Sequence, residues 1–464
     1  MENIKHSKKN MGSYGCAKAL NEFFNAAFYG FSFYFYEVEI GLTVWLVALG
    51  YIIFAVWNAI NDPLVGYLTD RPFKFTKKWG RRFPWIIFGG VCWVFSYILI
   101  FIPPNVDPKS SSGALIIFGW LIFATCLYDT FASIFFVNFS GLFPDKFRSV
   151  DERRKVNGIA TPIGMLGIFA GTIIPPLIIR FGEIQTFVIQ AGVMFIFGMI
   201  ILAFCIPGCR DDRETVDRYL ATYDTKKERE SFLSSLRTAM KQKSFVYFII
   251  AYLFYQTCTT LLQMSVTFLT RFILRMEASA MILIMLGFLI GAVLSIPFWI
   301  KLARKTNDNR KVMITAGSCM VLATIPLIFI ENYFVVIIAL FIWGFMFGGF
   351  WVMLALVIAD VIDESVARTG KREEALYNGF QQFFGRLSFV LAVLSIAIVQ
   401  TLTGFKEGVG PEGQTSLAIW GIHLYIGLIP MLFILASVII LWKFYDITPE
   451  KAKANREKIK ELGL

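Results

Sequence analysis

The sequence predicts an all-α integral membrane protein with twelve transmembrane helices in two bundles of six. Three observations predict it: the composition, the number of apolar segments of membrane length, and the placement of basic residues along the chain. Of the 464 residues, 56% are hydrophobic and 17% are charged, whereas soluble domains have about 25% charged and roughly 45–50% apolar residues. A water-soluble core cannot bury this much apolar surface, so the composition excludes a soluble enzyme.

Twelve segments are apolar over the length that crosses a bilayer. The ~30 Å hydrocarbon core requires about 20 apolar residues in a helix. The first segment has no small-residue cleavage site, so we expect a retained span rather than a signal peptide. The predicted spans are residues 14–36, 43–69, 84–103, 114–143, 158–181, 186–207, 244–272, 280–302, 311–330, 333–359, 374–404 and 417–442.

The basic residues fall mostly on one side of this arrangement. With the N-terminus in the cytoplasm, 37 of the 44 Lys and Arg residues lie on the cytoplasmic side, five lie opposite, and Lys18 and Arg386 lie within spans. Lys and Arg gather on the cytoplasmic side of membrane proteins. The pattern therefore predicts that both termini are cytoplasmic. It also explains the net charge of +11 without a nucleic-acid partner.

One long polar connection divides the chain into two halves. Residues 208–243 are the predicted cytoplasmic middle loop between bundles at 1–207 and 244–442, and residues 443–464 form a cytoplasmic tail. The halves have similar loops: basic segments follow the second and eighth spans, and segments ending in Asn-Gly follow the fourth and tenth. Two six-helix halves suit a transporter that works by alternating access, in which one half moves against the other.

Motifs for catalysis are missing from the sequence. It contains two histidines, and its seven cysteines show no paired spacing. No nucleotide-binding P-loop, zinc-binding HExxH or nucleophilic G-x-S-x-G motif occurs. We therefore expect a protein that is not an enzyme and has no cofactor. Its expected partners are a small-molecule substrate and the surrounding membrane lipid.

A polar cluster in the second span predicts a cation site. An ionisable side chain in mid-membrane costs ~2.5–3.5 kcal/mol on insertion scales, so it indicates a function. Asp62 precedes Pro63, and Asn58 lies one turn earlier on the same helix face. The proline removes a backbone donor and exposes carbonyl oxygens. Together with the carboxylate, these oxygens would suit Na⁺. Alternatively, burial makes Asp62 carry a proton instead. A third possibility is that the Asp62 carboxylate has only a structural role and joins two helices. No other metal site is expected.

Further polar groups in the spans predict a substrate cavity. Glu22 and Asp129 lie at a similar depth, and Arg386 is the one buried cation of the second half. An arginine that faces carboxylates can exchange them for ligand hydroxyls or an anionic group; the alternative is a fixed ion pair between helices. The predicted substrate-binding residues are Glu22, Asp129, Arg386, Gln381, Gln382, Trp57 and Tyr128.

Charged residues in the predicted cytoplasmic loops form a candidate gate. We expect a network there that holds the two halves together in the outward-facing state and breaks as they move. Simple anchoring by the basic residues is the alternative. The predicted members are Asp70, Arg71, Arg81, Arg82, Glu152 and Arg153.

Four segments, in order along the chain, carry a family resemblance. They are NDPLVGYLTDRPFKFTKKWGRRFPWI, FPDKFRSVDERRKVNG, IADVIDESVARTGKREEALYNGF and YDITPEKAKANREKIKEL. They resemble the glycoside–pentoside–hexuronide:cation symporters of the melibiose-permease type, a branch of the major facilitator superfamily. The resemblance implies the major facilitator fold and uptake of a sugar or glycoside coupled to Na⁺ or H⁺. We also expect a monomer in the plasma membrane.

The resemblance also implies roles for single positions. Asp62 stands at the position of the family's main cation-binding carboxylate, and Glu22 at that of its sugar-binding acid. Arg386 stands at the position of its cationic residue on the eleventh helix. Three positions depart from the pattern. Asn58 and Phe136 stand where sodium-coupled sugar transporters carry acids, and Ser140 replaces the aromatic residue that follows the helix-four acid. Asp129, two turns before Phe136, is expected to substitute in part.

These departures leave the coupling ion and the substrate open. With fewer carboxylates near the cation position, proton coupling through Asp62 becomes credible beside sodium coupling. A lysophospholipid is the alternative substrate, because eukaryotic relatives of the family transport such lipids and keep the Asp-Pro pair and the helix-eleven cation. A sensor or scaffold without transport is the remaining alternative.

Overall fold

The computed structural model describes residues 6–71, 73–222, 239–370 and 374–461, and this part of the chain is built from helices and their connections. Each of the twelve predicted spans is helical. Eleven helices of the described part are long and apolar enough to cross a membrane. The helix of the first predicted span is not one of them, since polar residues such as Lys18 and Glu22 interrupt it. The all-α membrane fold is therefore confirmed.

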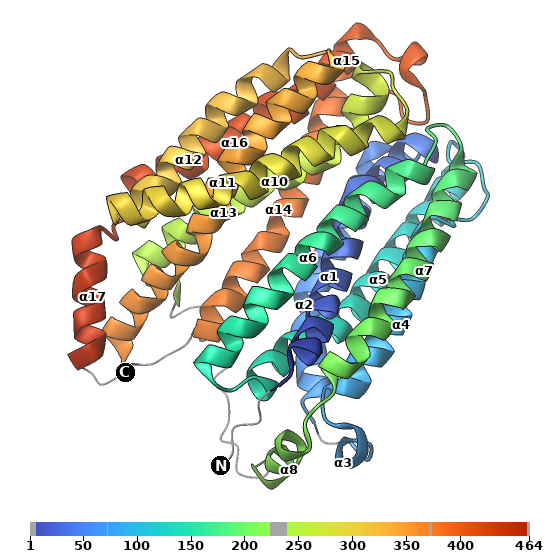
Figure 1. Cartoon of the computed structure of the whole chain (residues 1–464). Helices are drawn as coiled ribbons and strands as arrows, with labels where there is room; N and C mark the ends of the chain where they lie inside the picture. The colour runs from blue at the N-terminus through green and yellow to red at the C-terminus, as the bar shows by residue number, and fades with distance from the viewer. Residues whose placement is uncertain (1–5, 72, 223–238, 371–373, 462–464) are drawn as a thin grey trace. The chain divides into compact units, whose positions relative to one another are not determined.

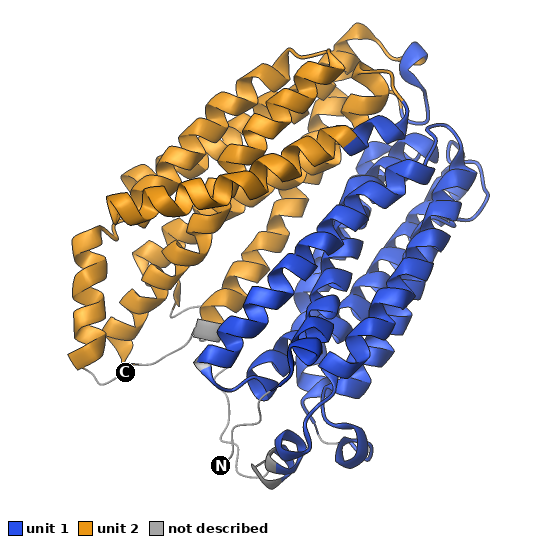
Figure 2. Ribbon diagram, in the orientation of Figure 1, with its two compact units in different colours: residues 1–228, 277–282, 407–412 blue, residues 229–276, 283–406, 413–464 orange. Residues whose placement is uncertain are grey.

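One compact unit, blue in Figure 2, comprises residues 1–228, 277–282 and 407–412. Within it, α1 packs on α6 and α7, while α5 packs on both α2 and α4 (Figure 1). The contact between α2 and α5 positions the polar cluster described below. The helices of this unit are α1 (Lys8–Tyr34), α2 (Val44–Thr69), α3 (Thr76–Trp79), α4 (Phe83–Ile100), α5 (Ser111–Lys146), α6 (Val150–Ile178), α7 (Ile184–Cys209) and α8 (Arg213–Thr222).

The second unit, orange in Figure 2, comprises residues 229–276, 283–406 and 413–464. Within it, α10 packs on α14 and α16, and α13 packs on α12 and α17. The last predicted span is formed by α15, a π-helical turn (Leu424–Leu428) and α16. The helices are α10 (Lys243–Phe268), α11 (Met281–Thr306), α12 (Asn309–Thr324), α13 (Tyr333–Thr369), α14 (Glu374–Thr403), α15 (Ser416–His423), α16 (Ile429–Lys443) and α17 (Pro449–Glu461).

Helix α13 is longer than the apolar span predicted at 333–359. It continues to Thr369 and ends at Gly370, whose φ of 67° is the left-handed cap that glycine adopts readily. The added turns carry Asp360, Asp363 and Glu364. The predicted span ended before these acidic residues because they are not apolar, although the helix continues through them.

Candidate functional site

Two short polar faces meet where α2 packs on α5 in the first unit. On α2, Asn58, Asn61 and Asp62 have the spacing that places side chains on one helix face. On α5, Asp129 and Ser133 lie one turn apart. Asp129 is 4% exposed and Asn61 is 3% exposed. The α2–α5 cluster, as we name these five residues, is therefore largely buried in the unit.

Hydrogen bonds join the two faces. The amide nitrogen of Asn58 donates to Oδ1 of Asp129, and the hydroxyl of Ser133 donates to Oδ1 of Asp62. The amide nitrogen of Asn61 lies 3.3 Å from Oδ2 of Asp129 and 3.4 Å from its backbone oxygen. Both carboxylates of the cluster are thus held by neighbours on the facing helix.

One acceptor of the cluster is left open. The amide oxygen Oδ1 of Asn58 is buried and has no hydrogen-bond donor among the residues that the structure describes. Helix α2 continues through Pro63, and because proline has no N–H, the carbonyl oxygen of Ala59 receives no helical hydrogen bond from it. Carboxylate, amide, carbonyl and hydroxyl oxygens are the ligands that hard cations prefer. The cluster has the chemistry of a small cation site.

The structure brings Asp129 to the residues predicted for the cation, although the sequence assigned it to the substrate. Sequence reasoning missed Asn61 and Ser133. The signal was present, because Asn61 lies three residues after Asn58 and Ser133 lies four after Asp129. The sequence alone does not show that these faces of α2 and α5 pack against each other.

The other predicted substrate residues of this unit lie outside the cluster. The indole nitrogen of Trp57 donates to the hydroxyl of Thr130 at 3.0 Å, and Trp57 is 39% exposed. The ring of Tyr128 is buried and stacks on Phe28 with centroids 5.0 Å apart. Glu22 interacts with neighbours on its own helix, α1. Of the predicted substrate set in this unit, Asp129 alone belongs to the cluster.

The second unit contains a cavity of about 480 Å³ between α10, α13 and α14. Two predicted residues, Gln381 and Gln382, line it, and Arg386 lies one turn further along α14. Since Glu22 and Arg386 belong to different units, their convergence on one substrate stays a prediction. The polar and aromatic lining residues are Tyr252, Trp351, Asp363, Asn378, Gln381 and Gln382.

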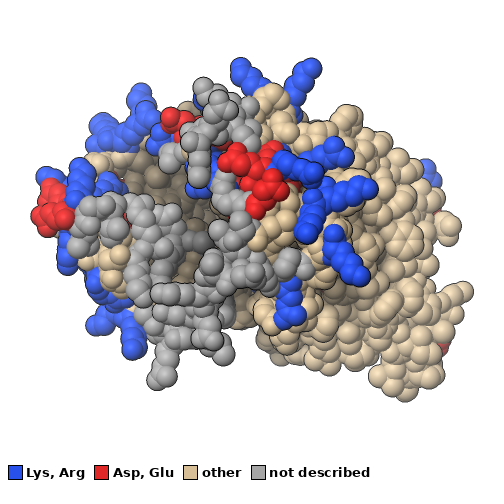
Figure 3. Space-filling view, turned by 90° about the horizontal axis from the view of Figure 1, so that it is seen from below, with Lys and Arg blue, Asp and Glu red and all other residues tan. Residues whose placement is uncertain are grey.

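Three predicted gate residues come together around an acid that sequence reasoning missed. Asp145 accepts from Arg81 at 2.5 Å and from Arg82 at 2.7 Å. Asp70 accepts from Arg81 at 3.1 Å. Asp145 stands at the end of α5 in the segment FPDKF. Figure 3 shows Lys and Arg side chains on the face of the molecule that is seen from below.

The other three gate residues have different partners. Arg71 contacts Tyr67 on α2. Arg153 donates at 2.7 Å to the backbone oxygen at the end of α5. Glu152 accepts from the backbone and the ring of His6. These recorded contacts all lie within the first unit, so a gate that joins the two halves stays a prediction.

Individual relatives are similar to most of the chain. A sodium-dependent lysophosphatidylcholine symporter of Gallus gallus is 23% identical over 446 residues, which cover 88% of this chain and 80% of that protein. A raffinose carrier protein of Pediococcus pentosaceus is 23% identical over 418 residues, covering 88% and 63%. The inward open structure of the E. coli xylose transporter XylE matches with a TM-score of 0.61 at 12% identity, covering 96% of this chain and 98% of that one, a likeness of fold.

A family model described as MFS/sugar transport protein matches residues 13–449. This match spans nearly the whole chain and confirms the resemblance found in the sequence. It also confirms that the protein is a transporter rather than an enzyme. The chain belongs to the MFS/sugar transport family of multi-pass membrane transporters.

Proposed function

We propose that the protein is a symporter that binds its coupling cation at the α2–α5 cluster. The observation that carries this proposal is the buried Oδ1 of Asn58, which lacks a donor among the described residues and lies beside the Asp129 carboxylate. Buried polar atoms in native structures are nearly always satisfied. A bound cation satisfies this oxygen and compensates the carboxylates of Asp62 and Asp129.

Sodium is the first candidate for this cation. The cluster supplies several oxygen ligands from two helices, an arrangement that a proton does not require. Relatives named as sodium-dependent symporters support this choice. Proton coupling is the alternative, in which Asp62 or Asp129 carries the proton.

We place the substrate in the cavity of the second unit. Sugar is supported by the amides of Gln381 and Gln382, which can pair with hydroxyls, and by the raffinose carrier among the relatives. Lysophospholipid is supported by aliphatic side chains that line the α13 side of the same cavity, and by the lysophosphatidylcholine symporters. In either case we propose alternating access by a monomer in the plasma membrane, with both termini cytoplasmic.

Uptake into proteoliposomes tests this function. The purified protein is supplied with sugars and lysophospholipids under an inward Na⁺ gradient, an inward H⁺ gradient or neither. We expect one gradient to drive accumulation of one substrate class, and Asp62→Asn to abolish it. Asp107→Asn is the matched control, because Asp107 is exposed in the connection between α4 and α5.

Two results contradict the proposal. Accumulation by Asp62→Asn at the wild-type level removes the coupling role of this carboxylate. A wild-type protein that folds but accumulates no substrate under either gradient favours the sensor or scaffold alternative.

A further inference from the structure

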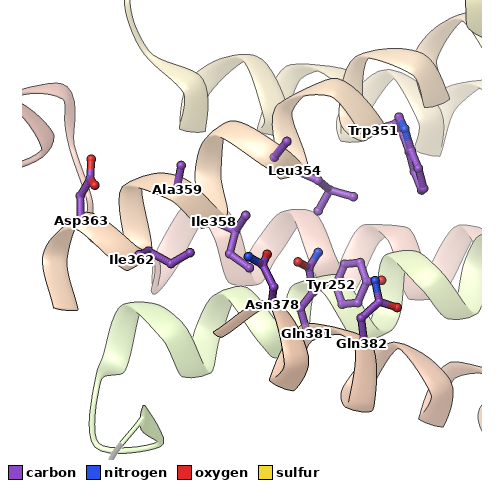
Figure 4. Close-up of a pocket in the computed structure, with 11 residues that line it drawn as sticks. Tyr252, Trp351, Leu354, Ile358, Ala359, Ile362, Asp363, Asn378, Gln381 and Gln382 are labelled. Atoms are coloured by element: carbon purple, nitrogen blue, oxygen red, sulfur yellow. The ribbon is translucent and has the colours of Figure 1, made fainter. Parts of the chain in front are cut away.

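The cavity of the second unit has two chemically different walls. Figure 4 shows the amide side chains of α14 directed toward α13. The α13 wall carries Leu354, Ile358 and Ile362, and the α14 wall carries Asn378, Gln381 and Gln382. A sugar has hydroxyls around its ring, and those that meet an aliphatic wall lose water without gaining a partner. An aliphatic chain has no such groups, so the α13 wall favours a ligand with one apolar side.

The cavity also differs between its ends. Trp351 and Asp363 lie at opposite ends of the α13 lining (Figure 4). Twelve residues of helix separate them by about 18 Å. Among the residues that the structure describes, Asp363 is the one charged residue that lines the cavity. The volume of about 480 Å³ is in the range of small-molecule sites, roughly 300–1,000 Å³. The cavity therefore suits an elongated ligand whose charged group lies at the Asp363 end.

One counter-ion of Asp363 comes from the C-terminal helix α17. Nη2 of Arg456 lies 2.8 Å from Oδ1 of Asp360, and its Nε lies 3.6 Å from Oδ2 of Asp363. The Asp360 side chain is 9% exposed and also accepts from Asn309 at 3.0 Å. The side chain of Arg456 is 58% exposed, so its longer pair with Asp363 is screened by water and weak. Arg456 is thus anchored at Asp360 and can release Asp363.

We propose that Asp363 binds the cationic group of an amphipathic substrate, and that Arg456 is an exchangeable counter-ion which this group displaces. The substrate class is a single-chain amphiphile with an ammonium or quaternary ammonium head. Its chain lies along the α13 wall, and its polar linkage faces the amides of α14. This inference rests on the proposed function, because it takes the cavity as the substrate site. Arg456 acts through Asp363 and is a positioning residue.

Lipid binding to the purified full-length protein in detergent tests the inference. The probes are lysophosphatidylcholine and a lysophosphatidylglycerol with the same acyl chain, which lacks the ammonium group. We expect Asp363→Asn to weaken binding of the choline lipid about tenfold relative to the glycerol lipid, an effect of one ion pair in a partly buried site. We expect Arg456→Gln to shift the same ratio severalfold in favour of the choline lipid.

Lys451→Gln is the matched control for a general weakening of the contact between α17 and α13. Lys451 also ties α17 to α13, through Glu364 at 2.5 Å, but it makes no recorded pair with Asp363. We expect this variant to keep the wild-type ratio of the two affinities. Circular dichroism and size exclusion of each variant show whether the fold is retained.

Three outcomes overturn the inference. The first is an unchanged ratio in folded Asp363→Asn, and the second is the same shift in Lys451→Gln as in Arg456→Gln. The third is a wild-type protein that binds neither lipid saturably while it accumulates a sugar under a cation gradient, which leaves the proposed function intact. Conversely, a choline preference that depends on Asp363 without any gradient-driven uptake supports this inference and contradicts the symporter.

Discussion

The imidazole of His6 lies between two carboxylates from distant parts of the chain. Nδ1 is 2.8 Å from Oε1 of Glu152, and Nε2 is 2.9 Å from Oδ2 of Asp212. Because a neutral imidazole has one N–H, only the charged form donates to both carboxylates. The hydrogen bond to Asp212 raises the pKa of His6 most; burial opposes it and the bond to Glu152 adds to it, and the net pKa lies above its usual value.

This bridge predicts a pH-dependent stability. Since the pKa of His6 is higher in the folded protein, the bridge contributes fully below the usual value of 6.5 and is lost as pH rises through the raised pKa. We expect His6→Gln to lower Tm most in acid and least in alkaline solution. Thermal unfolding from about pH 5.5 to about pH 9 measures this difference. Lys8→Gln, an exposed change nearby, is the control, and a Tm difference for His6→Gln that is constant with pH contradicts the bridge.

At the scale of helices, α6 and α1 pack closely because glycines of α6, which have no side chain, face α1. A Cβ on Gly167 would meet the backbone of Ala19, and one on Gly171 would meet the backbone of Phe23. Small residues at four-residue spacing allow membrane helices to approach in this way. The packing of α1, the least apolar of the predicted spans, thus depends on these two positions of α6.

Comparing alanine substitutions at Gly171 and Gly158 therefore separates the effect of helix packing on stability from the effect of helix propensity. We expect Gly171→Ala to destabilise the protein by roughly 1–3 kcal/mol, because the added methyl forces α6 away from α1. Gly158→Ala, also in α6, has open space around its Cβ and should be neutral or stabilising by up to about 1 kcal/mol. Thermal unfolding of both variants in the same detergent is the measurement. Equal Tm values for the two variants contradict the packing account.

For the whole molecule, the helices could be predicted because the bilayer thickness sets the length of an apolar span. The contacts between the helices could not be predicted. The length of apolar runs gave twelve helical segments, but it missed the polar turns of α13 that carry Asp363. The cost of a charge in lipid singled out Asp62 and Asp129. The sequence did not reveal that Ser133 meets Asp62, or that Asp145 joins the arginines, because such pairs depend on which faces of distant helices pack together.

The account centres on the α2–α5 cluster as a cation site, and direct binding of radioactive sodium to the purified protein tests this most directly. The wild-type protein is predicted to bind sodium saturably, and Asp62→Asn and Asp129→Asn are predicted to abolish that binding. Ser133→Ala should weaken it, whereas Ser96→Ala should leave it unchanged, because the buried hydroxyl of Ser96 bonds a carbonyl oxygen of its own helix, α4. Saturable sodium binding that survives in the folded Asp62→Asn and Asp129→Asn variants would contradict the account.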